Sequence, residues 1–201
     1  MLILILAILH IMINMFEVQF PEWDTQLFIF LNSLHTSWLD PVMKLFSAHW
    51  VWAPLYITIA FFMVRKKAWQ GVAAVLFMLL VFGLTDQLSV HLFKDVFQRF
   101  RPCREEAGLS ATIHLLEGCG GRFGFISNHA SNVFGLAIFT SLFFKTRWYS
   151  IFIFIWASLV AYSRIYVGKH FPLDIICGAA FGMLIGFLIY RLYLFVIKKK
   201  G

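Results

Sequence analysis

Apolar residues in this chain form long stretches with few polar interruptions instead of alternating with polar ones. Five such stretches end at polar or charged residues, and they cover residues 51–64, 68–93, 127–144, 148–166 and 172–197. Stretches of this kind are typical of helices that cross a bilayer, which need about 20 apolar residues. The pattern therefore predicts an all-α bundle with five membrane-spanning helices.

A further apolar run, residues 2–16, is interrupted only by His10 and Asn14. A helix over these 15 residues would be about 22 Å long, less than the ~30 Å of a hydrocarbon core. We interpret it as either a short sixth span or a tilted interfacial helix. It has no basic beginning and no small-residue cleavage pattern, so we do not expect a removed signal peptide.

Residues 17–49 mix acidic and aromatic side chains. This mixture predicts amphipathic helices at the membrane surface near the N-terminus, bounded by Pro21 and Pro41.

Composition supports an integral membrane protein. The 201 residues are 61% hydrophobic and 13% charged, and the mean hydropathy is +0.80. A soluble domain of this size could not bury so much apolar surface, so we expect a single membrane-embedded domain over residues 1–201. The net charge of +7 does not indicate nucleic-acid binding, because the cations lie between apolar spans instead of forming one basic face.

The distribution of cations predicts the orientation. Basic clusters at residues 65–67, 145–147 and 198–200 fall on one side of the predicted bundle, and the positive-inside rule makes that side cytoplasmic. Residues 94–127 and 163–174 then face outward. Cys103 and Cys119 lie in the outward loop, where a free thiol pair is unusual, so we predict a disulfide between them.

Residues 163–174 carry the densest group of reactive side chains. Asp174 follows His170 by four residues, so it can lie one turn above the imidazole if a helix begins near Pro172. Its carboxylate could accept a hydrogen bond from Nδ1–H and leave Nε2 free as a nucleophile or base. Arg164, with help from Lys169, could hold an anion in front of that ring. The alternative is an interfacial loop with snorkelling cations and an acidic residue at a helix start.

Two more polar clusters fall on the same side. Lys94 and Arg101 are seven residues apart, so a helix would project both from one face. Snorkelling cations that end a span are the alternative, but this side is the wrong one for such an anchor. Ser127, a candidate N-cap, begins the next span with His129 beside it, and free N–H groups there could bind an anion. Simple capping is the other interpretation.

Asp86 lies two turns before Lys94 in an apolar helix, where a charge needs a partner. It either supports the predicted anion site from behind or makes a structural hydrogen bond.

Taken together, K-x6-R-P, S-x-H and S-R-x5-H-x3-D resemble the type 2 phosphatidic acid phosphatase superfamily of lipid phosphatases, over about residues 68–190. The usual P-S-G-H of that family is Ile126-Ser127-Asn128-His129 here. The resemblance implies the following site residues: His170 as nucleophile, Asp174 orienting it, His129 as acid and base, and Lys94, Arg101, Ser127, Asn128 and Arg164 holding the phosphate.

The resemblance implies a lipid phosphatase that forms a phosphohistidine at the outer leaflet of the cytoplasmic membrane. Three cations would do the electrostatic work of Mg²⁺, no cluster resembles a metal site, and we expect no cofactor. Undecaprenyl diphosphate is the first expected substrate, with phosphatidylglycerol phosphate, phosphatidic acid and lipid A phosphate as alternatives. A non-catalytic protein that binds or transports anionic lipids is the rival class, but binding alone would not need both histidines and Asp174. The soluble haloperoxidases related to this family are disfavoured for such an apolar chain.

Gly178, Gly182 and Gly186 form a smooth stripe on the last predicted helix. Such a stripe allows close helix packing, and we favour packing inside the bundle over dimerisation.

Overall fold

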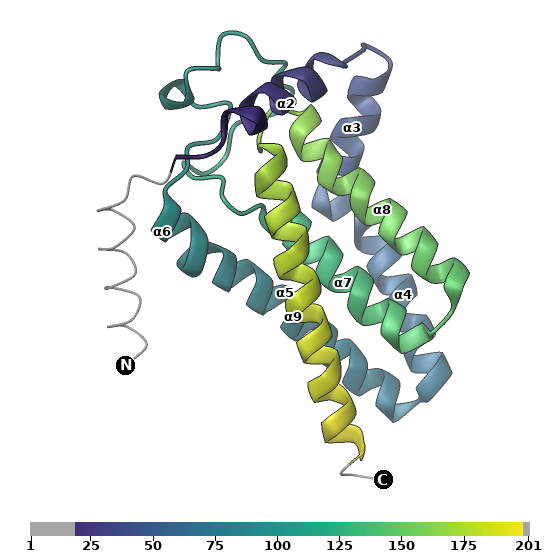
Figure 1. The fold of residues 1–201 in the computed structure, drawn as a ribbon. Coiled ribbons are helices and arrows are strands. Elements are labelled where there is room, and N and C mark those ends of the chain that lie inside the picture. The colour runs from purple at the N-terminus through teal and green to yellow at the C-terminus, as the bar shows by residue number, and fades with distance from the viewer. Residues whose placement is uncertain (1–18, 199–201) are drawn as a thin grey trace.

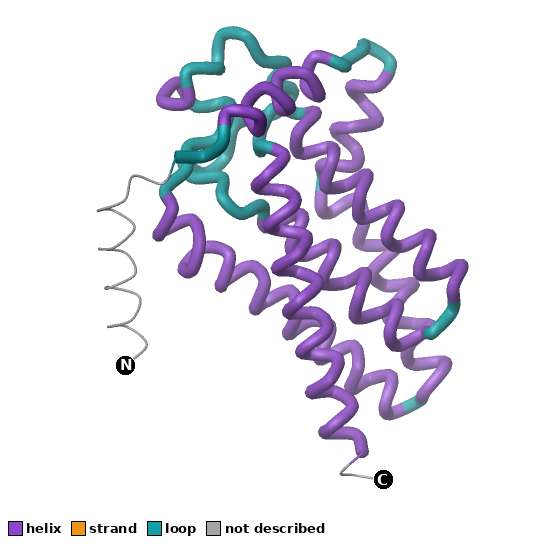
Figure 2. The backbone as a smooth tube through the Cα atoms, viewed as in Figure 1, coloured by secondary structure: helices purple, strands orange, loops and turns teal. Residues whose placement is uncertain are grey.

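The computed structural model describes residues 19–198, and these residues form helices joined by short turns and one long loop (Figures 1 and 2). The only strand-like feature among them is an isolated bridge between Phe100 and Phe123, so the predicted all-α class is confirmed. The longer helices are α2 (Glu22–Ser33), α3 (Leu39–Ser47), α4 (Ala53–Lys67), α5 (Trp69–Ser89), α7 (Asn128–Phe144), α8 (Arg147–Tyr166) and α9 (Pro172–Lys198). Short helical segments are the 3₁₀ turns η1 (His49–Trp52) and η3 (Glu105–Ala107), the π-helical turn η2 (Val90–Lys94) and α6 (Asp95–Phe97).

The five predicted apolar stretches correspond to α4, α5, α7, α8 and α9, but the count of five to six spans is not confirmed. Three continuous helical segments are long and apolar enough to cross a membrane: Trp69–Phe97, Arg147–Tyr166 and Pro172–Lys198. A fourth is added if α3 and the helix after it, bent by 75° at their junction, count as one broken span. Helix α7 has only 17 residues. The candidate sixth span, residues 2–16, lies outside the described residues.

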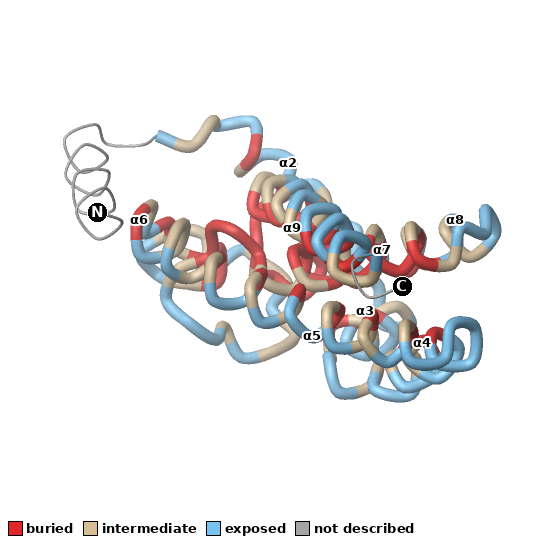
Figure 3. Tube along the Cα trace, turned by 90° about the horizontal axis from the view of Figure 1, so that it is seen from below, coloured by how far each residue is buried: buried red, intermediate tan, exposed pale blue. Residues whose placement is uncertain are grey.

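Helix α7 occupies the middle of the bundle, where it packs against α5, α8 and α9 (Figure 1). Its side chains Leu136, Ala137 and Phe139 are fully buried in the main core. The outer turns of the surrounding helices are exposed (Figure 3), and they carry large apolar residues such as Ile57 and Leu76. An exposed apolar surface of this extent is expected of a protein whose surroundings are lipid.

The glycine stripe of α9 packs inside the bundle, as predicted. A Cβ atom added at Gly182 would lie 2.1 Å from the carbonyl oxygen of Ser131 on α7, and one at Gly186 would lie 2.5 Å from that of Gly135. The two backbones therefore approach at a distance that only glycine permits.

The two ends of the bundle differ in chemistry. One end of the bundle is basic (Figure 1). It contains the end of α4, the turn between α7 and α8, and the end of α9. The long loop over residues 98–127 and α2 lie at the other. Asn32 of α2 fixes this second end, because its side chain donates to the carbonyl oxygens of Ile165 (3.2 Å) and Tyr166 (2.9 Å) and accepts from the N–H of His114 (2.7 Å).

The sequence predicts amphipathic helices within residues 17–49, with Pro21 and Pro41 as boundaries. Helix α2 does begin directly after Pro21. Pro41 is not a boundary, because α3 begins at Leu39 and includes it. Its missing N–H is tolerated there, since the first turn of a helix has no carbonyl partner for that group.

Candidate active site

His170 and Asp174 form the centre of the site, at the start of α9. Pro172 begins the helix, as the sequence predicts, and the imidazole Nδ1 of His170 lies 3.3 Å from Oδ2 of Asp174. The same carboxylate oxygen accepts the backbone N–H of Phe171 (3.1 Å). Both side chains are almost completely buried, so the ring has little freedom to turn.

Arg101 determines which nitrogen of His170 carries the proton. Its Nη1 lies 3.2 Å from Nε2 of His170. A guanidinium only donates hydrogen bonds, so Nε2 must accept and Nδ1 must hold the hydrogen that faces Asp174. Burial first, and then the charges of Arg101 and Arg164, lower the pKa of His170 well below its ordinary 6.5. The ring is therefore neutral, with the Nε2 lone pair directed at a cation that binds phosphate well.

Asp174 is itself held by a buried ion pair that the sequence did not reveal. Arg99 donates to Oδ1 of Asp174 (2.8 Å) and to Oδ2 of Asp24 (2.6 Å). Its guanidinium carbon lies 4.0 Å from the ring centroid of Phe20 and 3.9 Å from that of Phe171, so both faces are covered. Removing one partner of a buried pair leaves the other charge unpaired and is strongly destabilising. The only sequence signal was an acidic residue inside the amphipathic helix α2.

Asp24 also supports the start of α9. Its Oδ1 accepts the backbone N–H of Leu173 (2.8 Å), one of the N–H groups that a helix cannot satisfy by itself. Helix α2 therefore positions the carboxylate that holds His170.

Lys94 and Arg101 are brought together differently from the prediction. The helix ends at Phe97, and Gln98 adopts a left-handed conformation (φ 46°), so Arg101 lies in the loop and not on the same helical face as Lys94. Lys94 ends the π-helical turn η2, and turns of this kind occur frequently at functional sites. Both side chains nevertheless line one cavity of about 510 Å³.

The first turn of α7 also lines this cavity. Ser127 is the N-cap, as predicted, and its hydroxyl accepts the N–H of Ala130 (3.5 Å). Its own N–H donates to the carbonyl oxygen of Asp174 (3.0 Å) and is not free for an anion. Asn128 lines the cavity with His129 and Asp86, and its amide donates to Oδ1 of Asp86 (2.6 Å).

His129 has a partner that the sequence did not indicate. Nδ1 of His49, in the 3₁₀ turn before α4, lies 2.9 Å from Nε2 of His129. Both rings line the cavity, and His49 is exposed. Two imidazoles at this distance share one hydrogen. His49 belongs to no motif, so only the fold could reveal this pair.

Arg164 lies in a network at the end of α8. It contacts the hydroxyl of Ser47 and lies 3.8 Å from Glu117, which also accepts from Lys169 (2.6 Å). Burial opposes ionisation of Glu117, but the hydrogen bonds from Lys169 and Ser47 lower the pKa of its carboxyl. Within the described residues, Nε of Arg164 is buried without a hydrogen-bond partner. A buried guanidinium N–H without an acceptor is suited to an anion.

The loop between α6 and α7 joins these parts. Cys103 and Cys119 form a disulfide in the structure, with Cα atoms 5.7 Å apart, and Cys177 is free. Gly124 lies where the loop passes the site, and a Cβ atom there would be 3.0 Å from Oδ2 of Asp174. The described residues include no group of three or more His, Cys, Asp or Glu side chains that could hold a metal.

The fold and these residues are those of a membrane-embedded phosphatase. The family model of the PAP2 superfamily matches residues 71–198, and the chain belongs to that superfamily. It is 39% identical to a lipid A 4'-phosphatase of Porphyromonas gingivalis over 182 residues, which cover 89% of this chain and 76% of that protein. It is 30% identical to an undecaprenyl-diphosphatase of Sulfolobus acidocaldarius over 191 residues (93% of this chain, 87% of that protein).

Among solved structures, the PAP2-type phosphatidylglycerolphosphate phosphatase of Bacillus subtilis matches with a TM-score of 0.69 and 27% identity, over 95% of this chain and 93% of that one. The chain is therefore a lipid phosphatase of the PAP2 type, and the rival class of a non-catalytic lipid-binding protein is not supported.

Proposed function

We propose that the protein removes the 4'-phosphate of lipid A through a phosphohistidine on His170. The observation that carries the mechanism is the buried His170, held between Asp174 on Nδ1 and Arg101 on Nε2. This arrangement presents a neutral imidazole whose lone pair is directed at a phosphate-binding cation.

In the first half-reaction, Nε2 of His170 attacks phosphorus as the bond between phosphorus and the lipid oxygen breaks. His129 gives its proton to that departing oxygen, and Asp174 stabilises the positive charge that develops on the ring of His170. In the second half-reaction, His129 takes a proton from water as the water oxygen attacks phosphorus. The bond between nitrogen and phosphorus breaks, and its electron pair returns to Nε2 as phosphate leaves.

Lys94, Arg101 and Arg164 hold the phosphate, together with Ser127 and Asn128 at the start of α7. The cavity supplies two of these cations directly, and the unpartnered Nε of Arg164 supplies a further donor. Ser127 acts by capping the helix that presents Asn128. Asp86 orients the amide of Asn128 from behind.

His49 connects His129 to water. The pair shares a proton across 2.9 Å, and only the outer ring is exposed. His49 delivers a proton from solvent to His129 before the first half-reaction and returns it to solvent after the second. Between the two half-reactions, His129 recovers from water the proton that it gave to the lipid oxygen.

The cavity suits a lipid phosphate because its lining includes both charged and aromatic residues. Besides its polar residues, the cavity is lined by aromatic residues of the α3–α4 region and α5, namely Phe46, Trp52, Tyr56 and Phe82. The 39% identity to a lipid A 4'-phosphatase favours lipid A over undecaprenyl diphosphate, the first expectation from the sequence. Undecaprenyl diphosphate stays the second candidate, supported by the 30% identical relative. The basic clusters support a cytoplasmic membrane location with the site facing the periplasm or the cell exterior.

The test is phosphate release by the purified protein in detergent from a panel of lipids. We expect lipid A to lose its 4'-phosphate, identified by mass spectrometry of the product, at the highest kcat/KM. The panel also contains undecaprenyl diphosphate, phosphatidylglycerol phosphate and phosphatidic acid, and a higher kcat/KM on any of these would replace the proposed substrate. His170→Ala serves as the control for release that does not depend on this site.

A further inference from the structure

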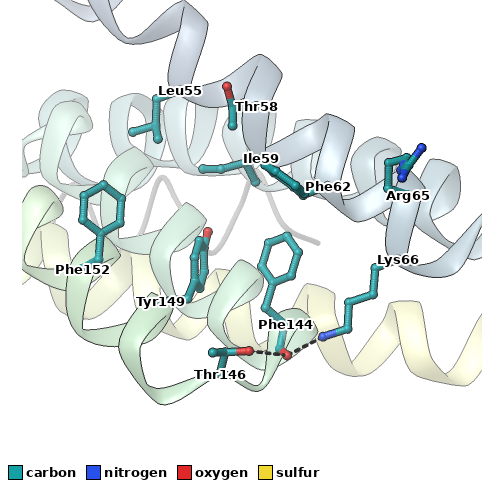
Figure 4. Close-up of a pocket in the computed structure, with 10 residues that line it drawn as sticks. All are labelled: Leu55, Thr58, Ile59, Phe62, Arg65, Lys66, Phe144, Thr146, Tyr149 and Phe152. Carbon is teal, nitrogen blue, oxygen red and sulfur yellow. Dashed lines mark hydrogen bonds between the residues drawn. The ribbon is translucent and has the colours of Figure 1, made fainter.

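A second cavity lies at the basic end of the bundle, between α4 and the start of α8 (Figure 4). Its volume is about 750 Å³, within the range of typical ligand pockets. Its walls are mainly apolar: Leu55, Ile59 and Phe62 come from α4, Phe144 ends α7, and Tyr149 and Phe152 come from α8. Phe62 and Phe152 are 55% and 54% exposed, so the groove is open towards the lipid that surrounds the bundle.

The charged groups of this groove lie at one end. Arg65 and Lys66 are in the last turn of α4, and Thr146 precedes α8. The ammonium of Lys66 donates to the carbonyl oxygen of Phe144 (2.7 Å), and the same oxygen accepts from the hydroxyl of Thr146 (3.2 Å) (Figure 4). This hydrogen bond holds Lys66 at the mouth of the groove, and the other N–H groups of its ammonium can donate to a ligand.

Among the described residues, neither cation is neutralised. Within residues 19–198, no carboxylate forms an ion pair with Arg65 or Lys66. Their remaining contacts are with aromatic rings: the Arg65 guanidinium lies 5.9 Å from the centroid of Phe61, and the Lys66 ammonium lies 5.6 Å from that of Phe144. Two unpaired cations at the end of an apolar groove match a ligand with an anionic head and a hydrocarbon tail.

We propose that this groove binds an anionic phospholipid, with its phosphate at Arg65 and Lys66 and one acyl chain between α4 and α8. Basic pockets between membrane helices are suited to anionic headgroups. A zwitterionic phospholipid would bring its own cationic group towards the two side chains, so charge selects the anionic lipid. The site is separate from the catalytic cavity, because the groove opens at the opposite end of the bundle, and it does not depend on the proposed substrate.

The experiment measures binding of phosphatidylglycerol and phosphatidylcholine, with identical acyl chains, to the purified detergent-solubilised protein by native mass spectrometry. We expect wild type to retain phosphatidylglycerol at least tenfold more tightly than phosphatidylcholine. The double variant Arg65→Gln/Lys66→Gln should lose this preference. The matched control Lys145→Gln/Lys198→Gln removes the same charge from the same end but leaves the groove intact, so it should keep the preference.

A second variant separates lost binding from lost folding. Thr58→Trp fills the groove from the exposed side of α4 and leaves both cations in place, so it should also lose the phosphatidylglycerol preference while circular dichroism stays unchanged. Equal binding of the two lipids by wild type would show a groove that accepts any lipid or detergent and would overturn the proposal. Retention of the preference by Arg65→Gln/Lys66→Gln, as in the control, would assign the bound lipid to the catalytic cations instead.

Discussion

At the scale of single residues, the state of His170 decides the chemistry. Asp174 on one side and Arg101 on the other leave the ring one tautomer, and that tautomer has its lone pair on the nitrogen that attacks phosphorus in the proposed mechanism. Arg101 lines the cavity, so an entering phosphate can take this guanidinium away from Nε2 and uncover the nucleophile. In the proposed mechanism, substrate binding and activation of the nucleophile are therefore one event.

The pKa of His170 can be tested directly. Burial first, and then the neighbouring cations, lower this pKa well below 6.5, so the ring should stay neutral when the pH falls from 8 to 6. NMR of protein with ¹³C-labelled histidine, assigned with His170→Asn, should show no titration of His170 in that range. The unfolded chain would bind this proton near pH 6.5, so the contribution of His170 to stability is lost as pH falls below that value. A titration midpoint at or above 6.5 would contradict the assigned environment.

The two catalytic histidines should differ in their dependence on the leaving group. His170→Ala should lose turnover on every substrate and form no phosphoenzyme, because no nucleophile remains. His129→Ala should be slowed by roughly 10²–10⁴-fold on a lipid monophosphate, whose alkoxide needs a proton to leave. Nitrophenolate leaves without a proton, so His129→Ala should still release it in a burst and accumulate phosphohistidine. If His129→Ala released neither the lipid alcohol nor nitrophenolate in the first turnover, the roles of the two histidines would be misassigned.

His49 should behave as a proton relay. We expect His49→Ala to lower kcat by less than the roughly 10²–10⁴-fold of a direct acid–base residue, with KM almost unchanged. Imidazole added to the buffer should restore the rate, because His49 is exposed and its place is open to solvent. His91 is the matched control: it is also exposed, pairs with Asp95 (3.3 Å) and does not line the cavity. If added imidazole left the rate of His49→Ala unchanged, His49 would have only a packing role.

At the scale of elements, the predictions succeeded where periodicity and capping chemistry decide the structure. The apolar stretches matched the helices closely, Ser127 capped α7 and Pro172 began α9. The prediction failed where tertiary contacts decide it. Nothing local shows that the chain turns left-handed at Gln98, yet this turn moves Arg101 off the helix and towards His170.

The packing of α7 on α9 gives a matched pair of glycine substitutions. Gly182→Ala would place a Cβ atom 2.1 Å from the carbonyl oxygen of Ser131. Because the added atom would clash with backbone, we expect the unfolding free energy to fall by ~1–3 kcal/mol. Gly83→Ala, on α5, has no atom within 4 Å of the added Cβ, so the better helix propensity of alanine should leave stability equal or higher by up to ~1 kcal/mol. Thermal unfolding in detergent measures both. Similar melting temperatures for the two variants would mean that the helices can separate without cost.

At the scale of the whole molecule, the sequence predicted the class and the helical bundle. It also predicted that Asp174 lies beside His170, because a helix that begins at Pro172 brings the carboxylate back to the ring. It did not predict the partners that come from distant segments. Arg99 meets Asp24, and His49 meets His129, only after the helices have packed. Such pairs leave no periodic or local signal, so they could be found only from the fold.

The orientation of the bundle is the remaining whole-molecule prediction, and it follows from charge. The basic clusters lie at one end and the loop over residues 98–127 lies at the other, so the positive-inside rule places this loop outside. In a Cys177→Ser background, where the other two cysteines are paired, Ser110→Cys in the loop should react with an impermeant maleimide in intact spheroplasts. Trp148→Cys, at a position 78% exposed beside Arg147, should react only after permeabilisation. If Trp148→Cys were labelled in intact spheroplasts and Ser110→Cys were protected, the bundle would be inverted and the phosphatase would act on the cytoplasmic leaflet.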